Sequence, residues 1–156
     1  MVFTTAATVS PRLGRRALLA TVLLSAAALA ACGKDDPQAK LEAAVRALQA
    51  AIEARDTGDV MDLLDEHFQG SGNLDRDGTR RMLTATFLRF QNIKVIAMSS
   101  QARVDAQTPT LGRVEAQVLV TGAQGLIPER AEPYSVRMEW RLVGGDWKLG
   151  DLRWDE

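Results

Sequence analysis

The stretch Ser135–Trp154, SVRMEWRLVGGDWKLGDLRW, decides the fold of this chain. Before the glycine pair, apolar and polar residues alternate, which is the period of a half-buried strand. Gly144–Gly145 then predicts a tight hairpin turn. In the returning strand the apolar phase changes at Gly150–Asp151, so we expect one extra residue there, a β-bulge. The stretch therefore predicts an antiparallel hairpin with one apolar and one polar face.

Two more strands are expected before this hairpin. Ile93–Asp105 has strand character with a bend near Ser99–Ser100, and Val114–Val120 alternates apolar with polar residues. Between them, Gln107–Gly112 contains proline and glycine and is typical of a turn. Together with the hairpin, these segments predict a four-stranded antiparallel meander.

Three helices are expected before the strands. Asp36 followed by Pro37 is typical of a helix start, and apolar spacings of three and four continue that helix to about Arg55. Asp75 is expected to cap the third helix. The apolar positions expected inward on the second and third helices are Val60, Leu63, Leu64, Phe68, Met82, Leu83, Phe87 and Phe90. Helices segregated before strands predict an α+β fold, with three helices packed in a curved sheet.

The N-terminal segment has the layout of a signal peptide. Three arginines precede an apolar run, Ala17–Ala28, which is too short to span a bilayer as a helix. Leu29-Ala30-Ala31-Cys32 then resembles the bacterial lipobox. That resemblance implies a signal peptide over residues 1–31, cleaved before a Cys32 that carries a diacylglyceryl thioether and usually a further acyl chain such as palmitate.

A lipidated Cys32 would fix the protein to a membrane, because two or more lipid chains give stable anchoring. Residues 32–36 form a very short tether, so we expect the domain of residues 37–156 to lie close to the bilayer. Gly33, where an aspartate would retain an enteric lipoprotein at the inner membrane, implies the periplasmic face of the outer membrane. Arg15-Arg16 partly resembles a twin-arginine signal, but the general secretory route is favoured.

Charge and cysteine content exclude several classes of function. The 156-residue chain has a formal charge of −1, and loss of the three leader arginines makes it −4, which disfavours nucleic acid as a partner. The only cysteine is taken by lipid, so no disulfide, thiol catalysis or thiolate metal site is expected. We expect neither a cofactor nor a metal.

Over about Lys40–Glu156 the order of elements resembles the nuclear transport factor 2-like (SnoaL-like) family. The resemblance rests on VMDLLDEHF, on LDRDGTRRML and on the closing GDWKL hairpin. It implies a cone in which a curved sheet wraps the helices and leaves a pocket. Members include isomerases, dehydratases, protein-binding modules and lipoproteins, so the fold alone does not give a function.

The isomerases and dehydratases of that family use a tyrosine with aspartates or with a histidine in the pocket. Tyr134 and His67 are the only tyrosine and histidine here, and are therefore the candidate acid/base residues. No acid falls on the inward face of the expected strands, and His67 is more typical of a half-buried structural histidine. Catalysis is therefore disfavoured.

An apolar pocket is expected on the inward face of the strands. Its candidate lining residues are Phe87, Ala116, Val118, Met138, Trp140 and Trp147, for which simple core packing is the competing interpretation. Asn73, Asp75 and Asp77 match half of a calcium loop, but Thr84 stands where a bidentate glutamate is needed. A helix cap explains those acids without a metal.

The sequence thus favours a membrane-anchored binding module for a small apolar ligand or an envelope protein. An isomerase- or dehydratase-like enzyme and a structural role with a filled pocket are the alternatives. Charged residues on the outward face of the strands, Arg113, Glu115, Arg137, Glu139 and Arg141, favour a monomer. Leu126 and Ile127, in the loop Gly122–Pro133, could meet a ligand, a partner or the bilayer.

Overall fold

The computed structural model describes residues 36–123 and 130–155. Contacts between residues divide the chain into two units, Met1–Asp35 and Asp36–Glu156. The predicted signal peptide, the lipidation of Cys32 and the loop tip with Leu126 and Ile127 lie outside the described residues. None of the helices among the described residues combines the length and the apolar character needed to cross a bilayer.

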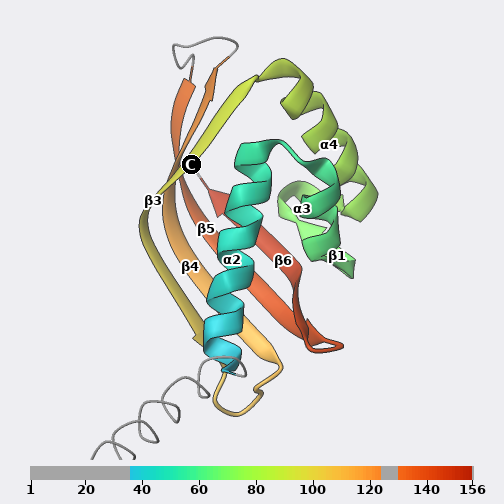
Figure 1. Ribbon diagram of the computed structural model, residues 1–156, viewed down its shortest axis with the longest axis vertical. Coiled ribbons are helices and arrows are strands. Elements are labelled where there is room, and N and C mark those ends of the chain that lie inside the picture. The colour runs from blue at the N-terminus through green and yellow to red at the C-terminus, as the bar shows by residue number, and fades with distance from the viewer. Residues whose placement is uncertain (1–35, 124–129, 156) are drawn as a thin grey trace, which may run out of the picture. The chain divides into compact units, whose positions relative to one another are not determined.

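Three helices and a mixed sheet make up the described unit (Figure 1). The helices are α2 Pro37–Ala54, α3 Thr57–Leu63 and α4 Arg76–Arg89, with a 3-10 turn, η1, at Ser71–Asn73. The strands are β1 Leu64–Gly70, β2 Leu74–Asp75, β3 Asn92–Val104, β4 Leu111–Ala123, β5 Arg130–Val143 and β6 Asp146–Asp155. The predicted α+β class and the three helices are confirmed.

The sheet has the order β2-β1-β6-β5-β4-β3. Its antiparallel part, β3 to β6, is the predicted meander. Both predicted irregularities are present: the β3–β4 register shifts between Ala97 and Ser99, and Gly150 is the extra residue where β6 passes Glu139 and Trp140. Gly144 and Gly145 both have positive φ, as the tight hairpin turn requires.

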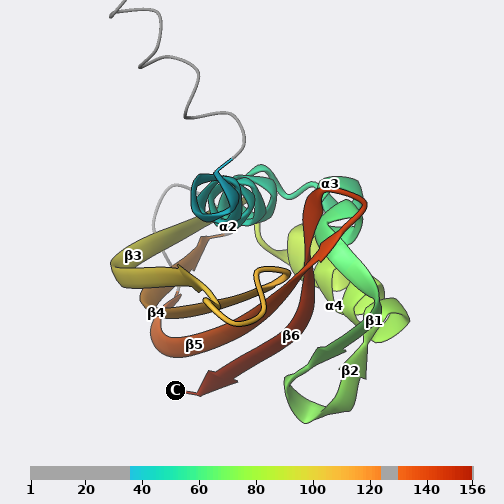
Figure 2. The same ribbon diagram turned by 90° about the horizontal axis from the view of Figure 1, so that it is seen from below.

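The sheet is larger than the four strands expected. β1 lies parallel to β6, and the two-residue β2 pairs with β1 on the far side (Figure 2). The segment from Leu64 to Phe68 is therefore strand, whereas the sequence predicted helix. Leu64 and Phe68 are both buried, and their spacing of four suits an irregular strand as well as a helix.

Local hydrogen bonds explain why the short helix stops at Leu63. The Asp65 carboxylate accepts a hydrogen bond from the backbone nitrogen of His67 at 2.8 Å, which competes with helical bonding. The Arg76 guanidinium donates to the carbonyl oxygen of Leu64 at 2.7 Å. Pairing with β6 then satisfies the backbone further along, so the chain leaves α3 as a strand.

α2 begins and ends as the sequence predicted. The Asp36 side chain accepts a hydrogen bond from the backbone nitrogen of Gln38, and Arg55 ends the helix in the left-handed conformation with φ 58°. Leu41, Leu48 and Ala51 form the buried face of the helix. Trp147 ties the start of α2 to β6, because its indole nitrogen donates to the carbonyl oxygen of Pro37 at 3.0 Å.

The core lies between the helices and the inner face of the sheet, which we define as the side of β3–β6 that faces the helices. Its most deeply buried side chains are Trp140, Leu41, Met61, Leu149 and Val114. The indole nitrogen of Trp140 has no hydrogen-bond partner among the described residues. Such a group costs about 1–3 kcal/mol, which the apolar contacts of the indole ring must offset.

The N-cap of α4 gives a test of this part of the fold. The Asp75 carboxylate accepts a hydrogen bond from the backbone nitrogen of Gly78 at 2.6 Å, as the cap interpretation predicted. We expect Asp75→Ala to lower the free energy of unfolding by about 1 kcal/mol in chemical denaturation of the full chain. The control Asp77→Ala removes an exposed acid of the same turn and should change stability by less than half as much.

Candidate functional site

Cross-strand pairing sets out the inner face as a grid. One row runs Ser100, Ala116, Val136, Trp154 from β3 to β6. The row toward the hairpin end holds Ala102, Val114, Met138 and Leu152, and the row on the other side holds Ala97, Val118 and Tyr134. On this face of the sheet, small residues on β3 and β4 therefore lie beside larger ones on β5 and β6. This leaves space above the β3 side of the sheet.

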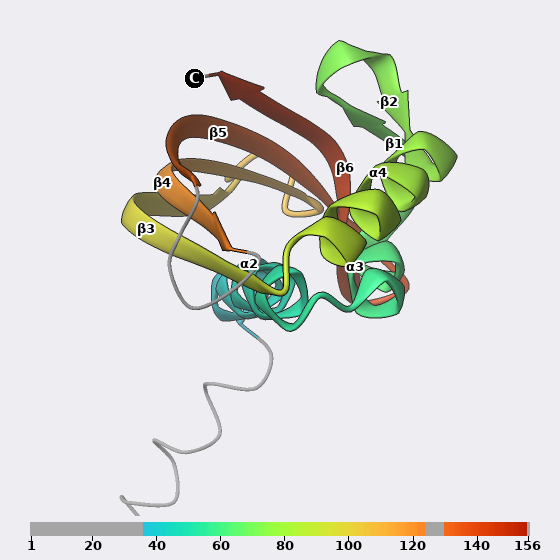
Figure 3. The ribbon, with the colours of Figure 1, turned by 90° about the horizontal axis from the view of Figure 1, so that it is seen from above.

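Figure 3 shows the curved sheet and the helices that face it. The space between them is a pocket of about 730 Å³, here called the inner pocket. The sheet contributes Val95, Ala97, Ser100, Ala102, Ala116, Val118, Val120, Tyr134, Val136, Met138, Leu149, Leu152 and Trp154. The remaining elements contribute Glu42, Val45, Arg46, Leu48, Gln49, Ile52, Val60, Leu64, Phe68, Thr79, Met82 and Leu83. The volume and the mostly apolar wall are typical of small-molecule sites.

The inner pocket has exposed lining residues on both sides of the gap between α2 and the edge strand β3, here called the mouth, and Met82 of α4 is exposed as well. Glu42 and Arg46 on the helix and Ala97 and Ser100 on the strand line the pocket and are exposed. Arg46 lies 4.0 Å from the carboxylate of Glu42, one helical turn away. The mouth is therefore the polar end of a pocket whose depth is apolar.

Side chains of α2 hold both ends of the β3 edge. Near one end, Gln38 donates to the carbonyl oxygen of Ala102 at 2.8 Å and accepts from the nitrogen of Val104 at 3.0 Å. Near the other end, Gln49 donates to the carbonyl oxygen of Val95 at 2.8 Å. These bonds satisfy edge groups that would otherwise be open to another strand, and they fix the distance between the two sides of the mouth.

Glu53 is a third α2 side chain that binds the edge of β3, and it gives a pH-dependent prediction. The backbone nitrogen of Val95 donates to its carboxylate at 3.0 Å, and Lys94 lies 2.9 Å away. The Val95 hydrogen bond, followed by that of Lys94, lowers the pKa of Glu53 from its ordinary value of 4.5. A lowered folded-state pKa stabilises the fold above the unfolded value, and that stability is lost as the pH falls through the folded value.

We therefore expect Glu53→Gln to be less stable than the wild type at pH 7, by about 1 kcal/mol. The difference should shrink as the pH falls below 4.5, because the wild-type carboxylate then takes up a proton. Thermal unfolding of both proteins between pH 7 and pH 3 measures this difference in stability. Glu66→Gln makes the same change at an exposed position of β1 and is the matched control for the stability difference at pH 7.

β5 starts at Arg130, earlier than the Ser135 expected from alternation, and this changes the chemistry of the inner face. Tyr134 lines the inner pocket, and Glu132 occupies the next inward position, opposite Val120. The Tyr134 hydroxyl donates a hydrogen bond to the Glu132 carboxylate. The expectation that no acid lies on the inward face is therefore wrong, because Pro133 hid the continuing strand.

The other candidate residues divide between pocket and core. Ala116, Val118 and Met138 line the inner pocket. Phe87, Trp140 and Trp147 were expected there too, but they are buried in the core and do not line it. Trp147 packs against the start of α2, and all three rings belong to the core, whereas the space lies over the small residues of β3 and β4. The α2 side of the pocket wall was not predicted, although Val45 and Ile52 belong to the apolar stripe of that helix.

His67 is an exposed residue of β1, does not line the inner pocket and lies on strand rather than helix. It therefore does not meet Tyr134 there. The described residues hold no group of three or more histidine, cysteine, aspartate and glutamate side chains arranged to bind a metal ion. The Asp75 carboxylate of the half calcium loop caps α4.

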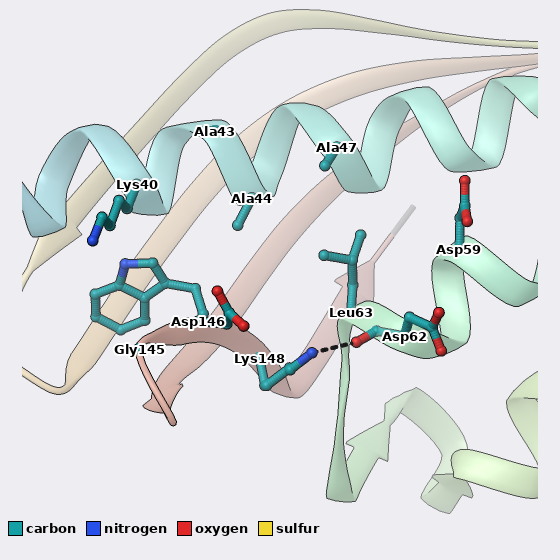
Figure 4. Close-up of a pocket in the computed structure, with 11 residues that line it drawn as sticks. Lys40, Ala43, Ala44, Ala47, Asp59, Asp62, Leu63, Gly145, Asp146 and Lys148 are labelled. Carbon is teal, nitrogen blue, oxygen red and sulfur yellow. Dashed lines mark hydrogen bonds between the residues drawn. The ribbon is translucent and has the colours of Figure 1, made fainter. Parts of the chain in front are cut away.

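A second hollow, the outer groove, lies between α2, α3 and the β5–β6 hairpin, with a volume of about 520 Å³ (Figure 4). Ala43, Ala44 and Ala47 form its α2 side, and Asp59, Asp62 and Asp146 lie around it. The Lys148 ammonium donates to the carbonyl oxygen of Asp62 at 2.7 Å, so this lysine fastens α3 to β6. The outer groove differs from the inner pocket in that charged side chains lie at its rim.

No family model matches the sequence, and no curated protein matches it. Solved structures do match the fold. An NTF2-like protein of unknown function from Pseudomonas putida superposes with a TM-score of 0.64 at 7% identity, over 76% of this chain and 84% of that one. The domain has the NTF2-like, cystatin-like cone fold.

Two further solved structures show how far the likeness extends. A candidate dehydratase of the NTF2-like family from Streptomyces avermitilis matches with a TM-score of 0.64 and 14% identity, over 75% of this chain and 93% of that one. Bd1075 of Bdellovibrio bacteriovorus matches with a TM-score of 0.65 and 14% identity over 74% of this chain, which spans only 40% of that protein. At these identities the likeness concerns the fold alone.

Proposed function

We propose that this cone domain is a binding module that takes up a small, mainly apolar molecule in the inner pocket. The observation that carries the proposal is a 730 Å³ pocket whose wall consists mainly of aliphatic and aromatic side chains. A ligand that covers this apolar wall removes it from water, and each Å² covered favours binding by about 25 cal/mol. The pocket has the size of known small-molecule sites.

The proposal includes the location that the leader suggests. A lipid on Cys32 would hold the domain on the periplasmic face of the outer membrane, where apolar molecules are concentrated. Monomeric behaviour is part of the proposal. It is supported by ion pairs within the outer face of the sheet, where the pairs are Arg113–Asp105 at 3.0 Å, Arg137–Asp155 at 2.8 Å and Arg153–Asp151 at 2.8 Å. A partner covering that face would have to desolvate them.

Native mass spectrometry of the protein extracted from its own membrane tests the binding. We expect a bound small molecule that is lost when the inner pocket is filled by mutation. Photo-crosslinking in cells, from the exposed position Met98 near the pocket mouth, distinguishes an envelope-protein partner. A protein that carries no molecule and binds no apolar probe would contradict the proposal.

A second candidate, an isomerase- or dehydratase-like enzyme, is favoured by one observation. Tyr134 lines the inner pocket and hydrogen bonds to Glu132, so a tyrosine–carboxylate pair borders an apolar site. Its test is incubation of envelope extracts with the full chain, followed by mass spectrometry for isomerised or dehydrated products. Activity that disappears in Tyr134→Phe would support the enzyme, and unchanged extracts would exclude it for those substrates.

A further inference from the structure

Two charged side chains stand at the mouth of the inner pocket, and both come from α2. Arg46 and Glu42 line the pocket, and 68% and 47% of their side-chain surfaces are exposed, in that order. Ala97 and Ser100, which line the strand side of the mouth, carry no charge. The head group of a ligand whose apolar part lies deeper in the pocket would therefore meet the charges of α2.

The acids of α2 on this side of the pocket already accept hydrogen bonds from the protein. The side-chain amide of Gln38 donates to one oxygen of the Glu42 carboxylate at 2.8 Å, and the Arg46 guanidinium lies 4.0 Å from the other oxygen. Farther along the helix, the Lys94 ammonium donates to the Glu53 carboxylate at 2.9 Å. A cationic head group would have to compete with these donors.

Arg46, in contrast, has hydrogen-bond donors to offer to a ligand. Within the described part of the chain its guanidinium has one charged neighbour, Glu42, and 4.0 Å is beyond hydrogen-bond range. A guanidinium carries five N–H donors in a planar fork that matches a carboxylate. Arg46 also lies in the middle of the α2 wall, because Val45 precedes it there and Gln49 and Ile52 follow it. A head group bound to Arg46 would therefore leave its chain beside the apolar depth.

We infer that the inner pocket takes a single-chain amphiphile with an ionised carboxylate head group. The chain lies in the apolar depth, and Arg46 binds the carboxylate at the mouth. This inference rests on the proposed binding function and specifies its ligand class. An ammonium head group of the same chain would be repelled by Arg46 and would compete with Gln38 for the Glu42 carboxylate.

Decanoate, decan-1-ol and decylamine have the same number of carbon atoms and isolate the head group. At pH 8 the first is anionic, the second neutral and the third cationic. Each displaces a neutral fluorescent dye, N-phenyl-1-naphthylamine, from the full chain in phosphatidylcholine nanodiscs, and empty nanodiscs correct for partition into lipid. We expect the wild type to bind decanoate about fivefold more tightly than decan-1-ol, the effect of a charge pair at an exposed mouth. Decylamine should bind no more tightly than the alcohol.

Variants of the two charged residues assign the preference. Arg46→Gln should bring the ratio of decanoate affinity to decan-1-ol affinity to about one while dye binding persists. Arg46→Glu should reverse the preference, so that decylamine binds more tightly than decanoate. Glu42→Gln removes the like charge beside the bound carboxylate, so the ratio should rise about twofold. Arg103→Gln makes the same charge change at an exposed position of β3 that does not line the pocket, and it should leave the ratio unchanged.

Equal affinities of the wild type for decanoate and decan-1-ol, a preference for decylamine, or a decanoate preference that survives Arg46→Gln would overturn the inference while leaving the proposed function in place. Failure of the dye and of all three probes to bind would instead reject the proposed function, and the ligand class with it. Retained dye binding shows that each variant is folded, so a changed ratio cannot come from loss of structure.

Discussion

Leu41→Ala is expected to lower the free energy of unfolding by about 3 kcal/mol, the cost of deleting a fully buried leucine. Leu41 has 0% of its surface exposed and joins α2 to the sheet beside Trp147. Chemical denaturation of the full chain measures the effect. Leu88→Ala is the matched control, because Leu88 lies on α4 with 82% of its surface exposed and should change stability by at most about 0.5 kcal/mol.

Gly112 makes this prediction sharper. A Cβ atom at position 112 would lie 2.7 Å from Leu41 Cδ2 and 3.3 Å from Trp147 Cζ3. Gly112→Ala alone should therefore cost about 2 kcal/mol through overpacking. In combination with Leu41→Ala the methyl group enters the space that the leucine vacates, so the double variant should lose clearly less stability than the two single losses added. Strict additivity would mean that α2 does not pack on β4 at this point.

The strand half of the fold could be predicted because its signals are local. Alternation from Val136 to Leu142 and the phase change at Gly150 reflect the period of the strands, and the glycine pair reflects the geometry of a tight turn. All three predictions are confirmed. The cap at Asp36 and the end of the helix near Arg55 are equally local predictions, and both are confirmed.

The errors came from features that depend on a distant segment. Leu64 and Phe68 have a helical spacing, but the hydrogen bond from Arg76 to Leu64 and the pairing with β6 make their segment a strand. Pro133 interrupts the apparent pattern of β5, yet the strand continues through it, because the residues on either side pair with β4. This continuation brings Glu132 to the inner face, so the polar pair of the site could not be found from the sequence.

The division between pocket and core was also beyond the sequence. Trp140 and Ala116 both face inward and differ only in size, and the alternating pattern treats them alike. What separates them is which helix covers which row: the helices fill the rows near Trp140, and they leave space over the small residues of β3 and β4. The position of a helix over the sheet is a tertiary property. The apolar stripe of α2 shows which side of the helix faces the sheet, but not how far from the sheet the helix lies.

Ala116→Phe is expected to abolish ligand binding with little effect on the fold. Ala116 lies in the middle of the inner-pocket floor, between Ser100 and Val136, and a phenyl ring there would occupy the space of the ligand. The affinity for the neutral fluorescent dye N-phenyl-1-naphthylamine is measured by titration of the full chain in lipid nanodiscs, with empty nanodiscs as the correction for partition into lipid. We expect this affinity to fall about a hundredfold or more. Gln117→Phe, the next residue on the outer face, should leave the affinity unchanged.

The stability of the same variant separates a binding pocket from a structural core. Inserting a large ring into a filled core costs about 1–3 kcal/mol or more, because neighbouring side chains must move. If the space over Ala116 is open to a ligand, the ring enters it without displacing protein atoms, so the free energy of unfolding should change by less than about 1 kcal/mol. A strong loss of stability with unchanged dye affinity would place the dye elsewhere and would favour a purely structural role for the inner face.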